Sequence, residues 1–189
     1  MNTYIALLRG INVSGSNLIK MDALKSCMET LGFMLVRTYI QSGNLVFNYQ
    51  EIPNTGLESK IGDTILTDFG CRVPVMVKSS IEIKKIITNN PFICERMTPI
   101  DTLHITFLSG MPDSGLLSNI LPLKNGVDEG IVLEDIIYLN CPQGYGRTKF
   151  TNTYFEKKLK LSATTRNWNT IFRLDEMAEE KTPIRTVNE

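Results

Sequence analysis

The sequence LVRTYIQSGNLVFNY, residues 35–49, contains two β-rich segments joined by a short connection that includes a glycine. Residues 35–40 and residues 44–49 are rich in the branched and aromatic side chains that strands favour. Between them stands Gln41-Ser42-Gly43, in which Gly43 suits the positive φ of a tight turn. This stretch therefore predicts a β-hairpin.

The segments on either side of this hairpin alternate between strand and helix patterns. Short apolar runs predict strands, and apolar residues at helical spacing predict helices that end at a glycine suited to a left-handed cap. In chain order, the expected elements are a strand at 4–8, a helix at 21–31, the two hairpin strands, a helix at 57–69 and a strand at 73–77, with Pro74 at an edge or a bulge. The β-α-β-β-α-β order is the ferredoxin-like plan.

The same order begins again in the second half of the chain, after a helix at 81–88 and a proline-containing link at 90–99. The expected elements are a strand at 103–108, a helix at 114–121, strands at 130–133 and 136–140, a helix at 152–159 and a last helix from about residue 168, capped by Asn167. We therefore expect the α+β class, with two ferredoxin-like βαββα(β) halves whose antiparallel sheets share one compact core. The first half spans residues 1–90, and the second spans residues 91–189 with the C-terminal helix; we expect the halves to pack as one unit.

The composition is that of an ordinary globular protein. The 189 residues are 42% hydrophobic and 21% charged, and 20 Lys and Arg balance 20 Asp and Glu. A net charge of zero gives no overall attraction to nucleic acid or to an anionic membrane. The longest apolar runs are far shorter than the roughly 20 residues of a membrane span, and the N-terminus lacks a signal-peptide pattern. We expect a cytoplasmic protein with no membrane association.

The cysteine pattern indicates neither a metal site nor a disulfide framework. The four cysteines are widely spaced and form no CxxC pair; they are Cys27, Cys71, Cys94 and Cys141. We expect buried, reduced thiols, no metal and no cofactor. The sequence leaves the oligomeric state open.

Three motifs carry a likeness to a known family: ALLRGINV at residues 6–13, TYIQSGNLVF at residues 38–47 and ATTRNW at residues 163–168. With Leu103-His104 and residues 146–149, they make the chain resemble the bacterial domain of unknown function family 1697 along nearly its whole length. The resemblance implies two ferredoxin-like halves, but no established substrate, cofactor or catalytic residue. Ser14 and Ser16 stand where the family more usually has a glycine and a basic residue.

Two loops have the composition of anion-binding sites. Residues 9–12 and the polar residues after them follow the first strand, and a helix N-terminus beside glycine and hydroxyl groups attracts anions. Residues 144–149, GYGRTK, place two glycines and two cations before the helix at 152. The alternative for each loop is an ordinary turn with solvated side chains.

Arg166 and His104 also stand out as candidates. Arg166 is expected in a loop that enters the last helix, where its charge opposes the helix dipole unless an anion or an acid lies near it. His104 is the only histidine; a partly buried strand histidine is the simplest interpretation, and no Ser-His-Asp hydrolase is indicated.

These observations favour binding of a small anionic ligand, phosphorylated or nucleotide-like, in a basic cleft. The expected ligand-binding residues are Arg9, Asn12, Ser42, Asn44, Arg147, Lys149 and Arg166. If acids such as Glu134 or Asp135 supply the counter-charge, the cations form a structural ion-pair network instead. The alternatives are an RNA-binding module, with Phe47 and Tyr49 on one strand face but no RNP1 pattern, and a protein-interaction domain without a small-molecule ligand. Catalytic residues and enzymatic activity remain open.

Overall fold

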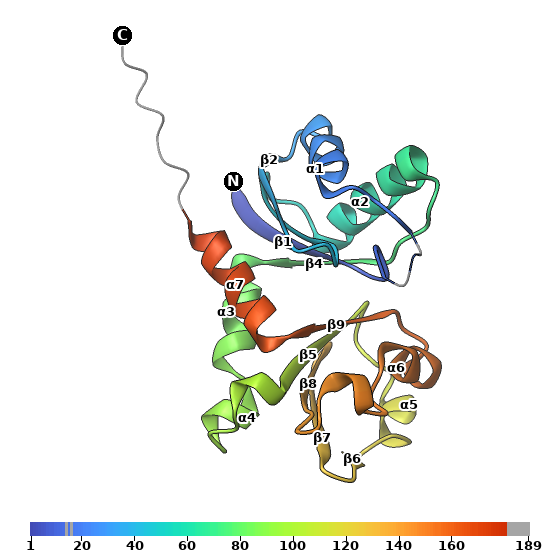
Figure 1. Cartoon of the computed structure of the whole chain (residues 1–189), viewed down its shortest axis with the longest axis vertical. Helices are drawn as coiled ribbons and strands as arrows, with labels where there is room; N and C mark the ends of the chain where they lie inside the picture. Colours follow the sequence, from blue (N-terminus) through green and yellow to red (C-terminus); the bar gives the residue numbers. More distant parts are fainter. Residues whose placement is uncertain (14, 16, 181–189) are drawn as a thin grey trace.

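The computed structural model describes residues 1–13, 15 and 17–180. Ser14 and Ser16 and the end of the 91–189 half, residues 181–189, lie outside the described residues. The first half is an antiparallel sheet of strands β1 (Asn2–Leu8), β2 (Met34–Tyr39), β3 (Asn44–Tyr49) and β4 (Val75–Ser79), in the order β2-β3-β1-β4. Helices α1 (Met21–Thr30) and α2 (Asn54–Phe69) cover its outer face (Figure 1).

The second half repeats this plan with one added strand. Its sheet consists of β6 (Leu123–Asn125), β7 (Asp128–Leu133), β8 (Ile136–Asn140), β5 (Leu103–Leu108) and β9 (Ala163–Asn167), in that spatial order. Helices α5 (Ser114–Ser118) and α6 (Asn152–Leu159) cover its outer face. Without β6, both sheets have the ferredoxin-like order second-third-first-fourth, which confirms the predicted α+β class.

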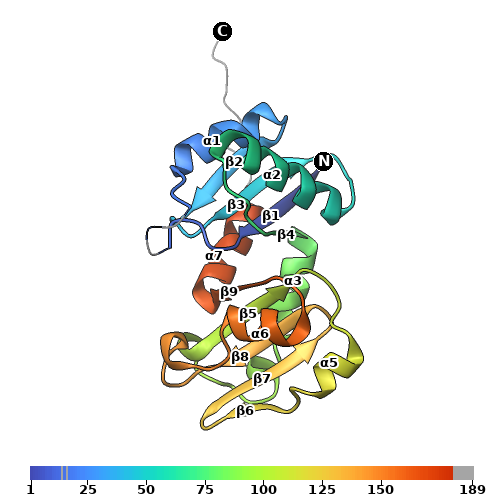
Figure 2. The same ribbon diagram turned by 90° about the vertical axis from the view of Figure 1, so that its right-hand side faces the viewer.

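Helices α3 (Ser80–Thr88) and α7 (Trp168–Glu179) lie against each other between the two sheets (Figure 2). Each follows an edge strand without a loop: α3 continues from β4, and α7 continues from β9. Ser79 caps α3 through a capping box, and the Asn167 side chain accepts the Thr170 N–H, which confirms the predicted cap of α7. The short helices α4 (Pro91–Cys94), η1 (Ile100–Thr102) and η2 (Tyr145–Arg147) complete the fold.

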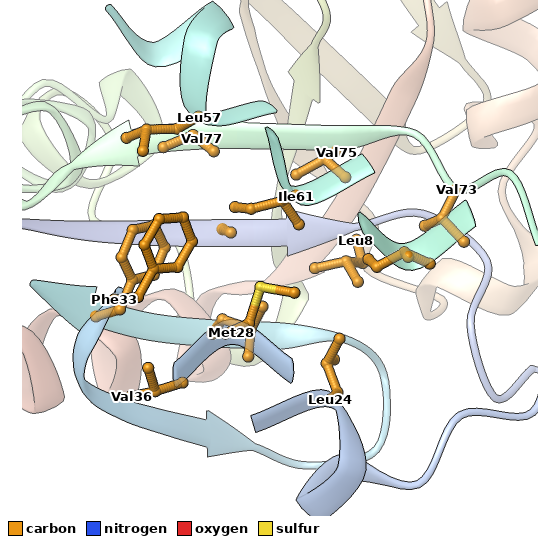
Figure 3. Close-up of a cluster of buried hydrophobic side chains, with 14 of the residues drawn as sticks. Leu8, Leu24, Met28, Phe33, Val36, Leu57, Ile61, Val73, Val75 and Val77 are labelled. Carbon is orange, nitrogen blue, oxygen red and sulfur yellow. The ribbon is translucent and has the colours of Figure 1, made fainter. Parts of the chain in front are cut away.

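The outer core of the first half forms because alternate strand residues meet the apolar faces of α1 and α2. Phe47 of β3 stacks on Phe33 with ring centroids 4.4 Å apart, and Met28 of α1 and Ile61 of α2 are fully buried (Figure 3). Gly32 and Gly70 follow the two helices with φ of +84° and +68°, as their predicted role as caps requires.

The inner faces of the two sheets share a second core with α3 and α7. Ile5 of β1 and Phe107 of β5 belong to this one cluster, together with Ile83 of α3 and Trp168 and Ile171 of α7. The buried surface between the halves is therefore apolar and continuous. That residues 1–90 and 91–189 form one folding unit rather than two separable domains stays a prediction.

The structure differs from the sequence-based expectations in four respects. Residues 163–167, expected as a loop, form edge strand β9, because the backbone of this polar segment pairs with β5. Strand β6 was not predicted, and the helix expected at 114–121 ends at Ser118. Of the four cysteines expected to be buried, only Cys141 is buried; Cys27 and Cys71 are partly buried, Cys94 is exposed, and all four are free thiols. Burial raises the pKa of the Cys141 thiol to about 11. Pro74 precedes edge strand β4, as expected.

Candidate functional site

The two halves meet through equivalent residues at two junctions. Lys78 of β4 lies opposite Ile5 of β1, and Arg166 of β9 lies opposite Ile105 of β5. Each cation is followed by the capping residue of the next helix, Ser79 or Asn167. Lys78 and Arg166 therefore occupy the same position in the two repeats.

The turns and helices around the two cations are equivalent too. Leu8 donates its N–H to the Gly43 carbonyl, and Leu108 donates its N–H to the Asp135 carbonyl, so the β2–β3 and β7–β8 turns correspond. Glutamates stand at the fifth position of α2 and α6, and each accepts a backbone N–H of its edge strand. In each matched pair below, the first residue belongs to the junction at Lys78 and the second to the junction at Arg166. The pairs are Lys78 and Arg166, Asp135 and Gly43, Glu134 and Ser42, Glu82 and Thr170, Lys85 and Arg173, Ser109 and Arg9, and Glu58 and Glu156.

The junction at Arg166, called the arginine side from here on, is held together by the Arg166 guanidinium. All five of its N–H groups donate to protein oxygens, which belong to Asn44 (Oδ1, 2.6 Å), Thr164 (Oγ1, 2.8 Å), Thr165 (O, 3.0 Å), Leu8 (O, 2.8 Å) and Ser42 (O, 3.0 Å). The chain positions are far apart, yet the three motifs at residues 6–13, 38–47 and 163–168 meet at this one side chain. Arg166 ties the end of β1 and the β2–β3 turn to β9.

No carboxylate of a described residue pairs with Arg166. The neighbouring Arg9 forms the ion pair instead: its Nε lies 3.2 Å from Glu156 Oε1, and both side chains are nearly three tenths exposed. Burial, with a smaller contribution from Arg9, lowers the pKa of Arg166 to about 10. Arg166 is still charged at neutral pH, so the junction holds two neighbouring cations, of which only Arg9 has a carboxylate partner.

Tyr145 of η2 borders the same junction from the outer face of the second sheet. Its hydroxyl is buried and completes no hydrogen bond with a described residue, although Thr165 and the N–H of Asn152 lie near it. Burial raises the pKa of Tyr145. Its ring stacks on His104 at 4.9 Å, and burial lowers the pKa of His104.

The structure places the other predicted site residues in different roles. Asn44 is fully buried and holds the turn through Tyr39 O and Ser42 Oγ, at 3.0 and 3.1 Å. Asn12, at φ +53°, bonds to Ile19 and to Gln41 O and so fastens the loop after β1. Arg147 and Lys149 are exposed and pair with no acid among the described residues. Arg9, Ser42, Asn44 and Arg166 are thus brought together directly, and Asn12 joins them through the turn.

The second junction, here called the lysine side, has the opposite character. Lys78 is only 13% exposed, and its Nζ lies 2.5 Å from Asp135 Oδ2 and 4.0 Å from Glu82 Oε1. Burial raises the pKa of Glu58 nearby, with smaller contributions from Asp135 and Glu82 in the same direction, while Lys78 opposes the rise. Burial also opposes ionisation of Glu82, but hydrogen bonds from Ser79 and Asn54 outweigh it and lower the pKa of Glu82.

Lys85 and Arg173 are equivalent, so they do not contribute to the difference between the two sides. The remaining matched positions hold two cations and one acid on the arginine side, and one cation and four acids on the lysine side. The acids on the lysine side are Glu58, Glu82, Glu134 and Asp135. One junction geometry therefore carries opposite charge at its two occurrences.

Comparison with known proteins bears on the family and on the fold. The sequence pattern of the family described as "Protein of unknown function (DUF1697)" matches residues 1–138. The chain belongs to the DUF1697 family. The solved structure of "conserved bacterial protein SP0830 from Streptococcus pneumoniae" is similar to this DUF1697 protein, with a TM-score of 0.74 and 21% sequence identity over 94% of this chain and 99% of that one. No curated protein matches the sequence significantly.

Several residues of the two junctions in this DUF1697 protein were missed from the sequence, chiefly Glu156, Tyr145, Glu58 and Glu82. One signal was present: an asparagine begins both α2 and α6, and a glutamate follows four residues later in each, at Asn54 and Glu58 and at Asn152 and Glu156. Glu134 and Asp135 were considered as partners of the basic residues, but Asp135 pairs with Lys78 on the opposite junction. In the described part of the chain, no helix is long and apolar enough to cross a membrane, and no cluster of His, Cys, Asp and Glu could hold a metal ion.

Proposed function

We propose that the protein binds a small anionic ligand, such as a phosphorylated or carboxylate-bearing molecule, at the arginine side. The observation that carries the proposal is that Arg9 lies close enough to Arg166 to lower its pKa, while Arg166 pairs with no carboxylate of a described residue and Glu156 pairs with Arg9. Partly buried cations that outnumber their acids attract anions, because water screens them less than it screens surface charges.

The two arginines have different roles in this proposal. Arg166 supplies positive charge but no donor, since all its N–H groups already bond to protein oxygens. Arg9 supplies the contact: its bonds to Glu156 use Nε and Nη2, and its Nη1 donates to no described residue. Arg147 and Lys149, on the exposed turn that begins at Tyr145, add charge for an arriving anion.

The RNA-binding alternative loses its proposed stacking surface. Phe47 is fully buried and Tyr49 is partly buried, and both rings pack against Phe33 beneath α1 and α2. Bases need an open aromatic face on which to stack. Strand β3 offers none on this side.

A titration with inorganic phosphate, a sugar phosphate and AMP at low salt tests the proposal. We expect at least one of these anions to raise the melting temperature in a saturable way, since a ligand that binds only the native state stabilises it. Arg9→Gln should weaken that ligand about tenfold or more, as expected for loss of a charged hydrogen bond. Arg96→Gln is the matched control, because it removes an arginine that also pairs with a glutamate, Glu129, but does not belong to the arginine side. Equal binding by both variants, or no response to any of the three anions, would contradict the proposal.

A further inference from the structure

A pocket of about 650 Å³ opens at the lysine side. Its walls come from β4, α3, the loop after β5 and the β7–β8 turn with the start of β8, so it lies between the two halves. Both its volume and its position at a junction are typical of small-molecule sites. Since the pocket and the arginine side are different junctions, the inference below is independent of the proposed function.

One wall of this lysine-side pocket is apolar. Ile86 of α3 and Ile136 and Tyr138 of β8 are buried beneath it, and the Tyr138 hydroxyl donates to the Ile86 carbonyl at 3.1 Å. Met111 lines the pocket as well and is 68% exposed. An aromatic ring, branched side chains and a flexible thioether suit a short hydrocarbon body.

The polar wall carries more acids than cations. Glu82, Glu134 and Asp135 line the pocket together with Lys78 and Lys85, and Glu58 lies close behind Lys78. Lys78 is already occupied, because it bonds to Asp135 and lies within 4.0 Å of Glu82. Glu134 is exposed at the turn and pairs with no cation among the described residues.

The arginine side makes the same junction without these acids. There the matched positions hold Thr170, Ser42 and Gly43 in place of Glu82, Glu134 and Asp135, and the two halves are joined by neutral oxygen acceptors. On the lysine side, Glu82 caps α3 and Asp135 pairs with Lys78, whereas Glu134 has neither role among the described residues. A charged residue that the fold does not require is often part of a functional site.

We propose that the lysine-side pocket binds a small organic cation, a molecule with a primary ammonium group on a short apolar body. The ammonium would lie at Glu134 and Asp135, and the hydrocarbon part would lie along Ile86, Ile136 and Tyr138. Charge-assisted hydrogen bonds to carboxylates orient the ammonium, and burial of the body contributes the hydrophobic part of the affinity.

Titration of the intact protein with n-butylammonium, monitored by thermal shift and by NMR of the methyl groups, tests this assignment. Butyrate, of similar size and opposite charge, is the ligand control. We expect n-butylammonium to bind saturably and to shift the methyl signals of Ile86, Met111 and Ile136, while butyrate leaves them unchanged. Glu134→Gln, at an exposed position where folding is not at risk, should weaken binding about tenfold, the effect of losing one charged contact.

Further variants separate the lysine side from other sources of binding. Asp135→Asn should also weaken n-butylammonium, whereas Arg9→Gln on the arginine side and Glu179→Gln on the surface of α7 should leave its affinity unchanged. The proposal is overturned if n-butylammonium does not bind, if butyrate shifts the same signals, or if Glu134→Gln binds as tightly as the unaltered protein.

Discussion

At the scale of single residues, Arg166 shows how one side chain can join two halves of a fold without an ion pair. Its planar guanidinium offers five N–H groups in a fixed fork, and the β2–β3 turn, β1 and β9 supply an oxygen for each. Lys78, at the matched position, has a single ammonium and pairs with a carboxylate instead. The same junction is thus made by neutral acceptors in one repeat and by opposite charges in the other.

Replacing Arg166 should therefore destabilise the protein strongly. Arg166→Met leaves several partly buried carbonyl and amide oxygens without a donor, and we expect a loss of about 3 kcal/mol or more in the free energy of unfolding. Arg166→Lys should recover only part of this loss, because an ammonium cannot reproduce the fork. Urea denaturation measures both variants.

The control for this prediction is Arg173→Met, which removes an exposed arginine that pairs with Glu176 and Glu180. Its cost should be much smaller than that of Arg166→Met, since exposed ion pairs contribute little. A similar small cost for Arg166→Met would show that the guanidinium is not what holds the junction.

At the scale of secondary-structure elements, the β2–β3 turn is shaped by the residues packed beneath it. Gly43 has φ of +77°, and a Cβ at this position would lie 2.8 Å from Leu8 Cβ and from Ile11 Cγ1. The close approach brings the Ser42 carbonyl within reach of Arg166 and the Gly43 carbonyl within reach of the Leu8 N–H. A side chain here would push the turn away from both partners.

Gly43→Ala should accordingly cost more than a glycine substitution that affects the backbone alone. Gly32 is the matched control: its φ is +84°, and an added Cβ would meet nothing within 4 Å. We expect about 1–2 kcal/mol for Gly32→Ala from the left-handed backbone, and a further 1–3 kcal/mol or so for Gly43→Ala from overpacking. Equal losses in thermal or urea unfolding would refute the close approach.

At the scale of the whole molecule, the core between the sheets makes the two halves depend on each other. Apolar residues of β1, α3, β5 and α7 belong to one buried cluster, so separating the halves would expose all of them to water. Arg166 and Lys78 bridge the two halves at the two junctions beside this shared core.

The chain should therefore unfold in a single step. Trp168, the only tryptophan, is buried at the start of α7 and reports on the shared core, whereas far-ultraviolet circular dichroism reports on both halves. We expect the two signals to give the same urea midpoint, as in two-state unfolding. A fluorescence change that precedes the loss of secondary structure would mean that the halves separate first and retain their folds.

The sequence by itself determined the element order, the hairpin, the glycine caps and the cap at Asn167, because apolar periodicity and turn chemistry act between residues close in the chain. The sequence also predicted one ligand site made of Arg9, Asn12, Ser42, Asn44, Arg147, Lys149 and Arg166. The structure bonds Ser42 and Asn44 to Arg166 and leaves Arg147 and Lys149 exposed, and the site as a whole stays a prediction. Only the tertiary structure decided that residues 163–167 form an edge strand, since this polar segment is recruited by backbone pairing with β5. It alone revealed the partners of Arg166, because Leu8 lies 158 positions away and no local pattern links the two. The opposite charge of the two junctions likewise emerges only when distant loops are folded together, since electrostatic interactions depend on distance in space and not along the chain.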